Sequence, residues 1–422
     1  MKISVIGAGF VGLTTACVLA SRGIKTRIYD VDQQKIETIF TGNVPFFEPK
    51  LEDLLRSVLR DGMLERHVWN DTSDLVIICV GTPSLSDGSI DTSQVQMAIE
   101  ECAARLPKGV LVAIKSTVIP GTTRELQKIV KENIDLVMIP EFLREGSAVD
   151  DALNPDRNVI GARNKNSGYK VAEILGLNPD DCIITSTFSA ESIKYLSNSF
   201  LATCISFTNE IFGGLNEDSD FEVDKILHGW HSDRRFKQTV NGISAITSYL
   251  TPGPGFGGSC FPKDVRALRA SMNSSAKNTQ ILDGVINANQ EVAKATSTWL
   301  NAQIPKNEHF VIFGVGFKDY TDDVRESPSV RLTQELRNLG RTGYWYDQYV
   351  QTVPGNFDLQ RATEEDLVQA KFFLLMHHSE YYRKVLLQIR ERVDITKDLT
   401  VFAVRYQDPI PGFRWVYPRT MV

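Results

Sequence analysis

The sequence has no long apolar run and no cluster of basic residues interleaved with aromatic ones. A membrane-spanning helix needs about 20 consecutive, mostly apolar residues. A secretory signal needs an apolar core before its cleavage site, whereas residues 3–6 run directly into a glycine turn. Nucleic-acid-binding domains are usually basic, and the net charge here is −6. These absences predict a cytoplasmic protein that binds neither membranes nor nucleic acids, and an anionic ligand would need a locally basic site.

Cysteine is scarce as well, with six in 422 residues, and no two of them are spaced as Cys-x-x-Cys. The sequence therefore predicts no metal site and no disulfide framework. Only Cys260 stands in a glycine-rich polar segment. The others are predicted to be small core hydrophobes: Cys17, Cys79, Cys102, Cys182 and Cys204.

Short apolar runs alternate with amphipathic segments over the first ~190 residues, a pattern typical of a doubly wound α/β fold with a buried parallel sheet. The predicted strands are Ile3–Ile6, Thr26–Tyr29, Leu75–Val80, Val110–Ile114, Leu136–Ile139 and Val159–Ile160. Apolar residues spaced mostly by three and four then predict one long helix over 189–215. A mainly helical region continues to about residue 296, broken by a loop over 251–264.

A second α/β pattern follows, so we expect three domains, at 1–190, 191–300 and 305–422, the first and last built on sheets. The two sheet domains could share a topology. The predicted strands of the last domain are Phe310–Gly314, Thr342–Tyr346, Phe372–Met376 and Leu399–Val404.

The first chemical motif is Gly7-Ala-Gly9-Phe-Val-Gly12, between the first strand and a helix over 11–21. Gly7 permits a tight turn, Gly9 lets the backbone approach a pyrophosphate, and Gly12 lets the helix pack closely on the strand. Asp30 ends the next strand, at the spacing of a residue that binds the adenosine ribose. Its carboxylate would repel a 2′-phosphate, so NAD is favoured over NADP. The alternative is a structural turn with a helix-capping aspartate.

Three further segments follow predicted strands at the edge where ligands of open α/β sheets bind. Val80-Gly81-Thr82-Pro83 and Lys115-Ser116-Thr117 are either ligand loops or ordinary loops. In Pro140-Glu141-Phe-Leu-Arg-Glu145-Gly146, the two glutamates share one face if the segment is helical. They would then either handle protons in a cleft or form a solvated helix face.

Lys194 and Asn198 stand four residues apart on the long helix, close to Glu191. Such a pair of donors could bind an oxyanion, although a surface lysine beside an asparagine is the simpler interpretation.

The segment Gly253-Pro-Gly255-Phe-Gly257-Gly258-Ser-Cys260 is too rich in glycine for a stable helix or strand. Glycines in that density are used where the backbone approaches a ligand or holds a special turn. If Asp264 opens a helix, the Cys260 thiol lies near that helix N-terminus and near Lys263, which both favour a thiolate. A loop cysteine without a role is the alternative. Lys318, Arg325 and Arg405 supply basic groups for an anionic nucleotide, or are surface charge.

Together these segments resemble the UDP-glucose/GDP-mannose dehydrogenase family. Eight family motifs occur in order, and with Arg405 they cover nearly the whole chain: GxGxVG, PFxEP, VGTP, KSTV, PEFLxEG, ExxKYxxN, GFGGSCFPKD and FKxxTDDxRES. The resemblance implies an N-terminal NAD-binding Rossmann domain, a central helical dimerisation domain and a C-terminal domain for a UDP-sugar. It also implies a homodimer or higher homo-oligomer. The expected reaction oxidises the C6 alcohol of a nucleotide sugar to the carboxylate with two NAD.

The resemblance also implies roles for individual residues. Cys260 would be the nucleophile, Lys194 and Asn198 would steady the oxyanion of tetrahedral intermediates, and Asp264, Thr117 and Glu145 would hold and activate water. The implied cofactor residues are Gly7, Gly9, Phe10, Val11, Gly12, Asp30, Lys35, Gly81, Thr82, Thr117, Glu145, Lys263 and Arg325. The implied substrate residues are Glu141, Phe142, Leu143, Lys194, Asn198, Tyr249, Gly257, Lys318 and, donated to a neighbouring subunit, Arg235.

Two segments depart from the family pattern, namely a longer stretch between Phe236 and Tyr249 and Ala403-Val-Arg405-Tyr406 in place of Asp-x-Arg-Asn. The PEFLREGSA sequence favours UDP-glucose as substrate. GDP-mannose, TDP-glucose and a UDP-N-acetylhexosamine are the alternatives, and a non-catalytic sugar-nucleotide sensor would not need the thiol. A single-step 3-hydroxyacid dehydrogenase would need neither the cysteine loop nor a second sheet domain.

Overall fold

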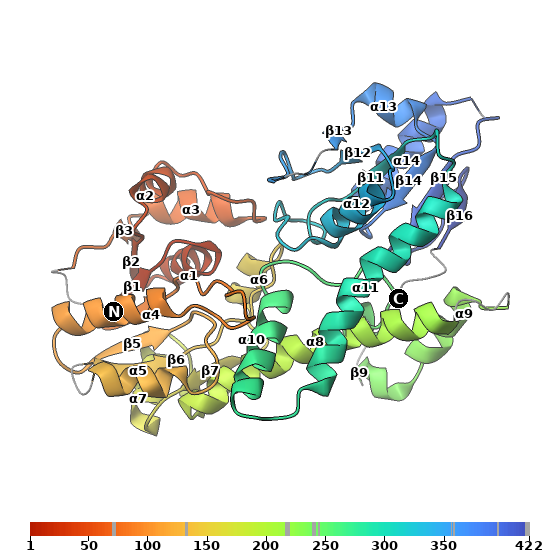
Figure 1. The fold of residues 1–422 in the computed structure, drawn as a ribbon. Helices are drawn as coiled ribbons and strands as arrows, with labels where there is room; N and C mark the ends of the chain where they lie inside the picture. Colours follow the sequence, from red (N-terminus) through yellow and green to blue (C-terminus); the bar gives the residue numbers. More distant parts are fainter. Residues whose placement is uncertain are drawn as a thin grey trace. The chain divides into compact units, whose positions relative to one another are not determined.

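The computed structural model describes residues 1–69, 73–130, 134–215, 220–238, 242–243, 245–355, 357, 359–394 and 396–417. The chain forms two compact units. Unit 1 comprises residues 1–197 with 270–276, and unit 2 comprises residues 198–269 with 277–422. Each has its own sheet (Figure 1).

The sheet of unit 1 has eight strands in the order β3-β2-β1-β4-β5-β6-β7-β8. The order of the first six is that of a dinucleotide-binding sheet. The strands are β1 (Lys2–Ile6), β2 (Lys25–Tyr29), β3 (Leu64–Arg66), β4 (Leu75–Ile78), β5 (Val110–Ile114), β6 (Ile134–Met138), β7 (Asn158–Gly161) and β8 (Cys182–Thr185).

The last two strands depart from the predicted parallel sheet, because β7 pairs antiparallel with β6 and parallel with β8. Residues 139–157 between β6 and β7 contain only one six-residue helix, α6 (Ala148–Leu153). They make no full crossover, so the chain re-enters the sheet from the edge where β6 ends.

Helices cover both faces of this sheet, as expected for a doubly wound fold (Figure 1). Side chains of β4 show the two faces, since Leu75 and Ile77 belong to one buried apolar cluster and Val76 and Ile78 to the other. The other helices of this unit are α1 (Phe10–Ser21), α2 (Gln33–Phe40), α3 (Leu51–Arg60), α4 (Ser93–Arg105), α5 (Thr122–Val130), α7 (Lys165–Ile174) and the 3₁₀ turn η1 (Pro179–Asp181).

Unit 2 contains a second sheet, with the order β13-β12-β11-β14-β15-β16 and every described pair parallel. This order repeats that of the first six strands of unit 1, which confirms the shared topology. The strands are β11 (Phe310–Phe313), β12 (Gly343–Tyr346), β13 (Gln360–Arg361), β14 (Phe372–Leu375), β15 (Thr400–Ala403) and β16 (Arg414–Val416).

The predicted long helix is α8 (Thr187–Leu215), which begins in unit 1 and ends in unit 2. The predicted loop over 251–264 ends earlier than expected, because α10 (Phe261–Ser274) already begins at residue 261. The remaining helices of unit 2 are α9 (Val223–His231), α11 (Gln280–Gln303), α12 (Pro328–Asn338), α13 (Glu364–Gln369), α14 (Glu380–Arg392), and the 3₁₀ turns η2 (Arg234–Phe236) and η3 (Ala245–Tyr249).

The stretch between Phe236 and Tyr249, longer than the family pattern, includes a two-stranded ribbon of β9 (Lys237–Gln238) and β10 (Gly242–Ile243). Residues 239–241 and 244 of this stretch lie outside the described residues.

All six cysteines are free thiols. Cys182 is only half buried, against the prediction, because it begins β8 at the sheet edge, whereas Cys17, Cys79, Cys102 and Cys204 are buried as predicted. Within the described ranges, no helix is both long enough and apolar enough to cross a membrane.

Candidate active site

The glycine turn between β1 and α1 has the geometry of a dinucleotide cradle. Gly7 has a φ of +100°, and a Cβ there would lie 2.7 Å from the carbonyl group of Cys79. A Cβ at Gly12 would lie 1.8 Å from the Gly7 carbonyl oxygen. At Gly9, by contrast, no described atom lies within 4 Å of a built Cβ. Gly7 and Gly12 are thus required by close packing, and Gly9 leaves the space that a pyrophosphate needs at a helix N-terminus.

Asp30 follows β2 and is buried beside this turn. Its Oδ2 accepts a hydrogen bond from the Ala8 N–H at 2.7 Å and pairs with the Lys35 ammonium at 3.1 Å, while Oδ1 accepts from the Asp32 N–H at 3.0 Å. Burial opposes ionisation, but these hydrogen bonds and the Lys35 charge outweigh it and lower the pKa of Asp30. Asp30 is therefore an ionised side chain that stabilises the glycine turn through its hydrogen bond with Ala8. This structural role is compatible with binding of the ribose.

The loops that follow β4 and β5 are joined by hydrogen bonds at the same edge of the sheet. The Thr82 hydroxyl donates to the Thr117 carbonyl at 3.0 Å, and the Ser116 hydroxyl donates to the Val80 carbonyl at 2.7 Å. Gly81 is exposed, Thr82 is buried and Thr117 is half buried. The predicted residues are thus brought together at the carboxyl ends of β4 and β5.

The segment after β6 is a loop and not a helix, so the expectation that Glu141 and Glu145 share a helix face is wrong. Residues 139–144 form no regular element, and the turn at 145–146 that follows has Gly146 in the left-handed region at a φ of +81°. A residue without an assigned role holds the loop instead. The buried Glu48, in the PFxEP motif, accepts hydrogen bonds from the N–H groups of Gly146 and Ala148, both at 2.7 Å.

Glu141 is buried in an ion pair. Its Oε1 accepts a hydrogen bond from the Lys194 ammonium at 2.6 Å, and its Oε2 accepts from the Leu143 N–H at 2.8 Å. Lys194 is only 4% exposed, so the simpler interpretation of a surface lysine is wrong. Burial raises the pKa of Glu141, but Lys194 and then Lys115 reverse the direction and the net pKa is lowered. The structure thus provides a buried, charged pair on α8 and the loop after β6.

Glu191, one turn earlier on α8, has a structural task. Its fully buried carboxylate accepts hydrogen bonds from the N–H groups of Gly121 and Thr123 and from the Thr123 hydroxyl, at 2.5–2.8 Å. These groups begin α5, so Glu191 caps that helix and joins it to α8.

In unit 2, Cys260 directly precedes α10, and its carbonyl accepts the Asp264 N–H at 2.8 Å. Asp264 is 1% exposed, and its two oxygens accept hydrogen bonds from the Asn198 amide and the Lys263 ammonium, each at 2.6 Å. The half-buried thiol therefore lies at a helix N-terminus, as predicted. Lys263 is committed to Asp264, so the helix end rather than the lysine is the main local source of positive potential.

The glycines before Cys260 let its loop pack on the loops of the second sheet. A Cβ at Gly257 would lie 2.3 Å from the Glu326 carbonyl oxygen. At Gly258, where φ is +80°, a Cβ would lie 2.7 Å from the Phe317 ring. The Gly258 N–H also donates to the Arg325 carbonyl at 3.0 Å. Close backbone packing thus explains both glycines.

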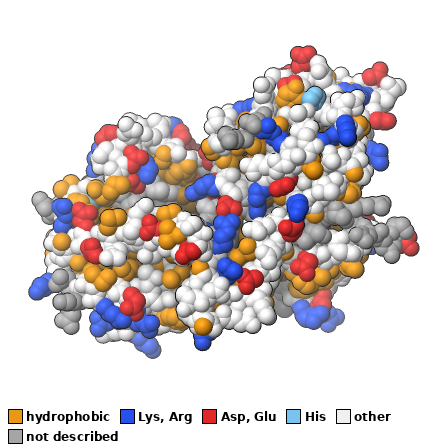
Figure 2. Space-filling view, in the orientation of Figure 1, with side chains coloured by type: hydrophobic (Ala, Val, Ile, Leu, Met, Phe, Trp, Pro, Cys, Tyr) orange, Lys and Arg blue, Asp and Glu red, His pale blue; other side chains and the backbone are white. Residues whose placement is uncertain are grey.

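The basic groups predicted for an anionic ligand follow strands of the second sheet, Lys318 and Arg325 after β11 and Arg405 after β15. Figure 2 shows that Lys and Arg side chains are interspersed with Asp and Glu over the face drawn. Arg405 follows β15, and Tyr249 and Asp319 lie close enough to act on its charge. Lys318 is half buried beside the Phe317 ring. Arg325 and Arg235 are exposed and pair with Asp323 and Asp233.

A glycine turn held by an acidic residue at the end of the second strand is the cofactor site of nucleotide-dependent dehydrogenases. The cysteine at a helix N-terminus adds a nucleophile to that class.

Family models identify the particular family. The chain matches the NAD binding domain of the UDP-glucose/GDP-mannose dehydrogenase family over residues 1–176, its central domain over 188–291 and its UDP binding domain over 311–407. The chain belongs to this family, is an NAD-dependent oxidoreductase, and combines a nucleotide-sugar-binding domain with its NAD-binding domain.

Curated relatives and solved structures agree. The chain is 35% identical to UDP-glucose 6-dehydrogenase of Rickettsia bellii over 354 residues, which cover 81% of this chain and 79% of the relative. It is 35% identical to UDP-glucose 6-dehydrogenase of Pseudomonas aeruginosa over 359 residues, covering 81% and 77%. The structure of a UDP-glucose dehydrogenase from Pyrobaculum islandicum superposes with a TM-score of 0.85 at 29% identity, covering 99% of this chain and 96% of that one.

Proposed function

We propose that this enzyme oxidises the C6 alcohol of UDP-glucose to the carboxylate of UDP-glucuronate. The balanced reaction is RCH₂OH + H₂O + 2 NAD⁺ → RCOO⁻ + 2 NADH + 3 H⁺. The relatives named above as UDP-glucose dehydrogenases support the substrate. The observation that carries the chemistry is Cys260 at the N-terminus of α10, beside a hydrogen-bonded Asn198–Asp264–Lys263 cluster.

A thiol can supply what the second oxidation requires, which is a tetrahedral carbon that carries a transferable hydride. NAD, when bound, would supply the hydride acceptor for both oxidations, one molecule for the alcohol and a second for the tetrahedral carbon that follows. The Cys260 thiolate adds to the aldehyde and forms that tetrahedral carbon, and loss of hydride leaves a thioester, which water hydrolyses. We assign Lys194 and Asn198 as donors to the oxyanion of the tetrahedral stages. Asp264, with Thr117 and Glu145, holds the water.

The chain's own residues fit NAD in unit 1. The open space at Gly9 admits a pyrophosphate, and Asp30, with Lys35 next to it, lies where the adenosine ribose would be held. Phe10, Val11, Gly12, Gly81 and Thr82 complete the proposed cofactor site. Lys263 and Arg325, which the resemblance also implied for the cofactor, stay proposals, as do the substrate residues Phe142, Leu143, Tyr249, Gly257 and Lys318.

Incubation with a panel of sugar nucleotides tests the reaction. We expect UDP-glucose to be the best substrate and to yield two NADH per molecule consumed, with no aldehyde released. NADH absorbance and product analysis measure both quantities. One NADH per substrate with free aldehyde would contradict four-electron oxidation. A higher rate with GDP-mannose, TDP-glucose or a UDP-N-acetylhexosamine would keep the chemistry and change the substrate, whereas tight binding without NADH would indicate a sensor.

Cofactor selection should depend on the charge of Asp30. In Asp30→Asn, an amide oxygen can still accept the Ala8 N–H while the repulsion of a 2′-phosphate is removed. We expect the NAD/NADP ratio of kcat/KM to fall by roughly tenfold or more, which corresponds to about 1.4 kcal/mol. Steady-state kinetics with both cofactors measures the ratio, and Asp32→Asn, two residues away, is the control. An unchanged ratio would place Asp30 away from the ribose.

We also propose that the protein is a homodimer and that the two subunits meet through α8. In this proposal residues 191–300 form a central helical dimerisation domain, and the protein is cytoplasmic. Exposed apolar side chains follow one face of this helix at spacings of four, seven, four and four: Leu196, Phe200, Phe207, Ile211 and Leu215, which are 40–67% exposed. A patch of this kind is typical of an interface.

Light scattering after size exclusion should give about twice the 47.2 kDa of one chain. Phe200→Asp should halve that mass, because a charge in an apolar interface is costly. Ile281→Asp is the control, because Ile281 is an apolar residue on α11 that is 72% exposed, against 60% for Phe200. A monomeric wild type would exclude this interface. Arg235, exposed on η2, would in such a dimer be available to the neighbouring site.

A further inference from the structure

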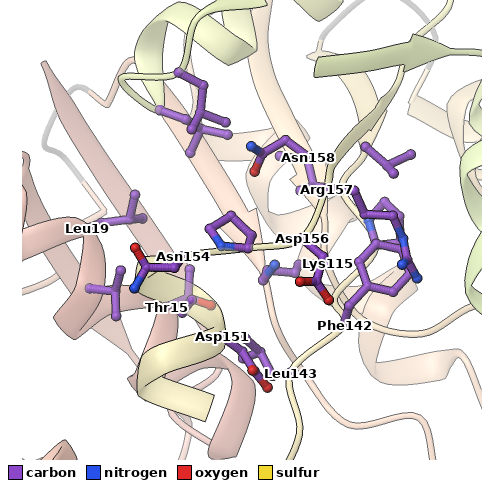
Figure 3. A pocket seen from close by; sticks show the side chains of 18 of the residues that line it. Thr15, Leu19, Lys115, Phe142, Leu143, Asp151, Asn154, Asp156, Arg157 and Asn158 are labelled. Carbon is purple, nitrogen blue, oxygen red and sulfur yellow. The ribbon is translucent and has the colours of Figure 1, made fainter. Parts of the chain in front are cut away.

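A cavity of about 150 Å³ lies within unit 1, on the sheet face that α1 covers. Its walls come from α1, the loop after β6, the segment before β7 and the end of β5. In Figure 3 the Lys115 side chain, from the end of β5, extends into this cavity between Asn154, Asp156 and Phe142. The cavity adjoins the loop of Glu141, because Pro140 and Phe142 both line it.

Lys115 differs from the other cations of the cavity wall. Arg22 donates to the carbonyl groups of Ala152 and Leu153. Arg144 pairs with Asp151, and Arg157 donates to the Ser197 hydroxyl and lies over the Phe142 ring. The Lys115 ammonium makes no hydrogen bond or ion pair within 4 Å with any residue of the described part of the chain.

The charged groups around Lys115 are those of the Glu141–Lys194 pair. Burial lowers the pKa of Lys115, the Cys79 thiol at the end of β4 and the Glu141 carboxylate raise it, and Lys194 lowers it. Glu141 in turn is kept ionised first by Lys194 and then by Lys115. The other charged residues that line the cavity are Arg22, Arg144, Asp151, Asp156 and Arg157, and none of them is among the groups that shift the pKa of Lys115.

Two cations therefore act on the buried Glu141 carboxylate, and only one of them is hydrogen-bonded to it. Lys194 makes the short hydrogen bond to Glu141 and stands on α8, four residues before Asn198. Lys115 makes no direct bond to Glu141 and lines the cavity. An ion pair needs one cation only, so the second lysine requires an explanation, because Lys115 is half buried and partial desolvation of an extra positive charge is unfavourable.

We propose that Lys115 is a positioning residue that acts through Glu141. It supplies the second positive charge that lets the Lys194 ammonium turn from Glu141 toward an oxyanion. In the resting pair, one carboxylate faces one bonded ammonium. When an oxyanion forms, two negative charges compete for Lys194, and a buried Glu141 that lost its only partner would oppose the reaction. With Lys115 present, two cations face two anions. This inference rests on the proposed function, in which Lys194 stabilises the tetrahedral intermediates.

The test is a set of variants of the full-length enzyme, assayed with UDP-glucose and NAD. Lys115→Met should lower kcat at least tenfold, the factor of one pKa unit, with the KM for NAD within about twofold. Lys115→Arg should retain most activity, since the cavity offers room for the larger cation. Arg22→Met, which changes a committed cation of the same wall, should match the wild type. An unchanged kcat in Lys115→Met would overturn the proposal.

A double-mutant comparison shows whether Lys115 acts through Glu141. Glu141→Gln removes the carboxylate that the second charge serves, so adding Lys115→Met should cost no further activity. If the two losses multiply, Lys115 acts elsewhere and the proposal fails.

The pH profile of kcat should shift as well. Loss of the Lys115 charge raises the pKa of both Glu141 and Lys194, so the limbs that these groups control should move to higher pH. A lower kcat with an unmoved profile would indicate a merely structural lysine.

A measurement without turnover separates this proposal from the proposed function. In protein with ¹³C-labelled glutamate, the Glu141 carboxyl resonance is assigned by its absence in Glu141→Gln. It should titrate at higher pH in Lys115→Met than in the wild type. An unshifted titration would overturn the role of Lys115 even if UDP-glucose is oxidised. If the wild type oxidises no sugar nucleotide, the proposed function fails while the electrostatic coupling is still measured.

Discussion

Cys260→Ala should abolish conversion of the alcohol to the acid, with a loss of at least about 10³-fold in kcat, the scale of losing a covalent nucleophile. The fold should be unaffected, because the half-buried thiol stands in a loop and contributes little to the core. Cys260→Ser retains a hydroxyl of similar size that is a far weaker nucleophile. It should stall after the first or second hydride transfer and accumulate bound aldehyde or a covalent sugar ester.

Intact-protein mass spectrometry of Cys260→Ser, after incubation with UDP-glucose and NAD, would detect the ester. Cys182→Ser is the matched control, since that thiol is also half buried but lies on β8. A general loss of stability would appear as a lower unfolding midpoint with otherwise intact kinetics. Normal oxidation to the acid by Cys260→Ala would falsify the thioester mechanism.

Lys194→Met should give the second large effect, on stability as well as on activity. Removing one partner of a buried ion pair typically costs about 3–5 kcal/mol, because the other charge is left unpaired. Here we expect the lower end of that range, since Lys115 still faces Glu141. The double variant Lys194→Met, Glu141→Gln should recover part of the loss. Urea denaturation of the wild type, the single variant and the double variant measures their free energies of unfolding. A loss below about 1 kcal/mol in Lys194→Met would show that the pair is unimportant for the fold.

The sign of the pH dependence follows from Glu141. Its pKa is lowered in the folded protein, so its stabilising contribution is present above the unfolded value of about 4.3 and is lost as the pH falls through the folded value. In Lys194→Met the folded pKa rises toward the unfolded value, so acidification should remove less stability through this group than it removes from the wild type, and the difference in stability between the two proteins should shrink as the pH falls.

Sequence patterning predicted most directly the strands with apolar residues on both faces. β1, β4 and β5 are buried nearly throughout, and continuous apolar runs reveal such strands. Four strands of the two large sheets were not predicted: β3, β8, β13 and β16 are short, lie at the sheet edges and are partly exposed. Edge strands satisfy fewer packing constraints, so their sequences need not be apolar.

The site was predictable where one local segment carries the geometry. The turn at Gly7 and the helix that follows Cys260 are of this kind. Pairings between distant segments were not. Single-sequence spacing does not show that Glu141 meets Lys194, or that Glu191 caps a helix that begins near Gly121. Such pairings follow from the topology of the sheet.

Glu48 gives the loop after β6 an anchor that lies outside the loop. The hydrogen bonds from Gly146 and Ala148 reach a carboxylate 98 and 100 residues earlier in the chain. If residues 139–148 of a relative were grafted into another chain, the graft would bring the loop residues but not the carboxylate at position 48 that holds the loop. Recombination between members of this family should preserve loop geometry only when the exchanged block, or the recipient, supplies an acceptor at position 48. The natural unit of exchange is thus discontinuous in sequence.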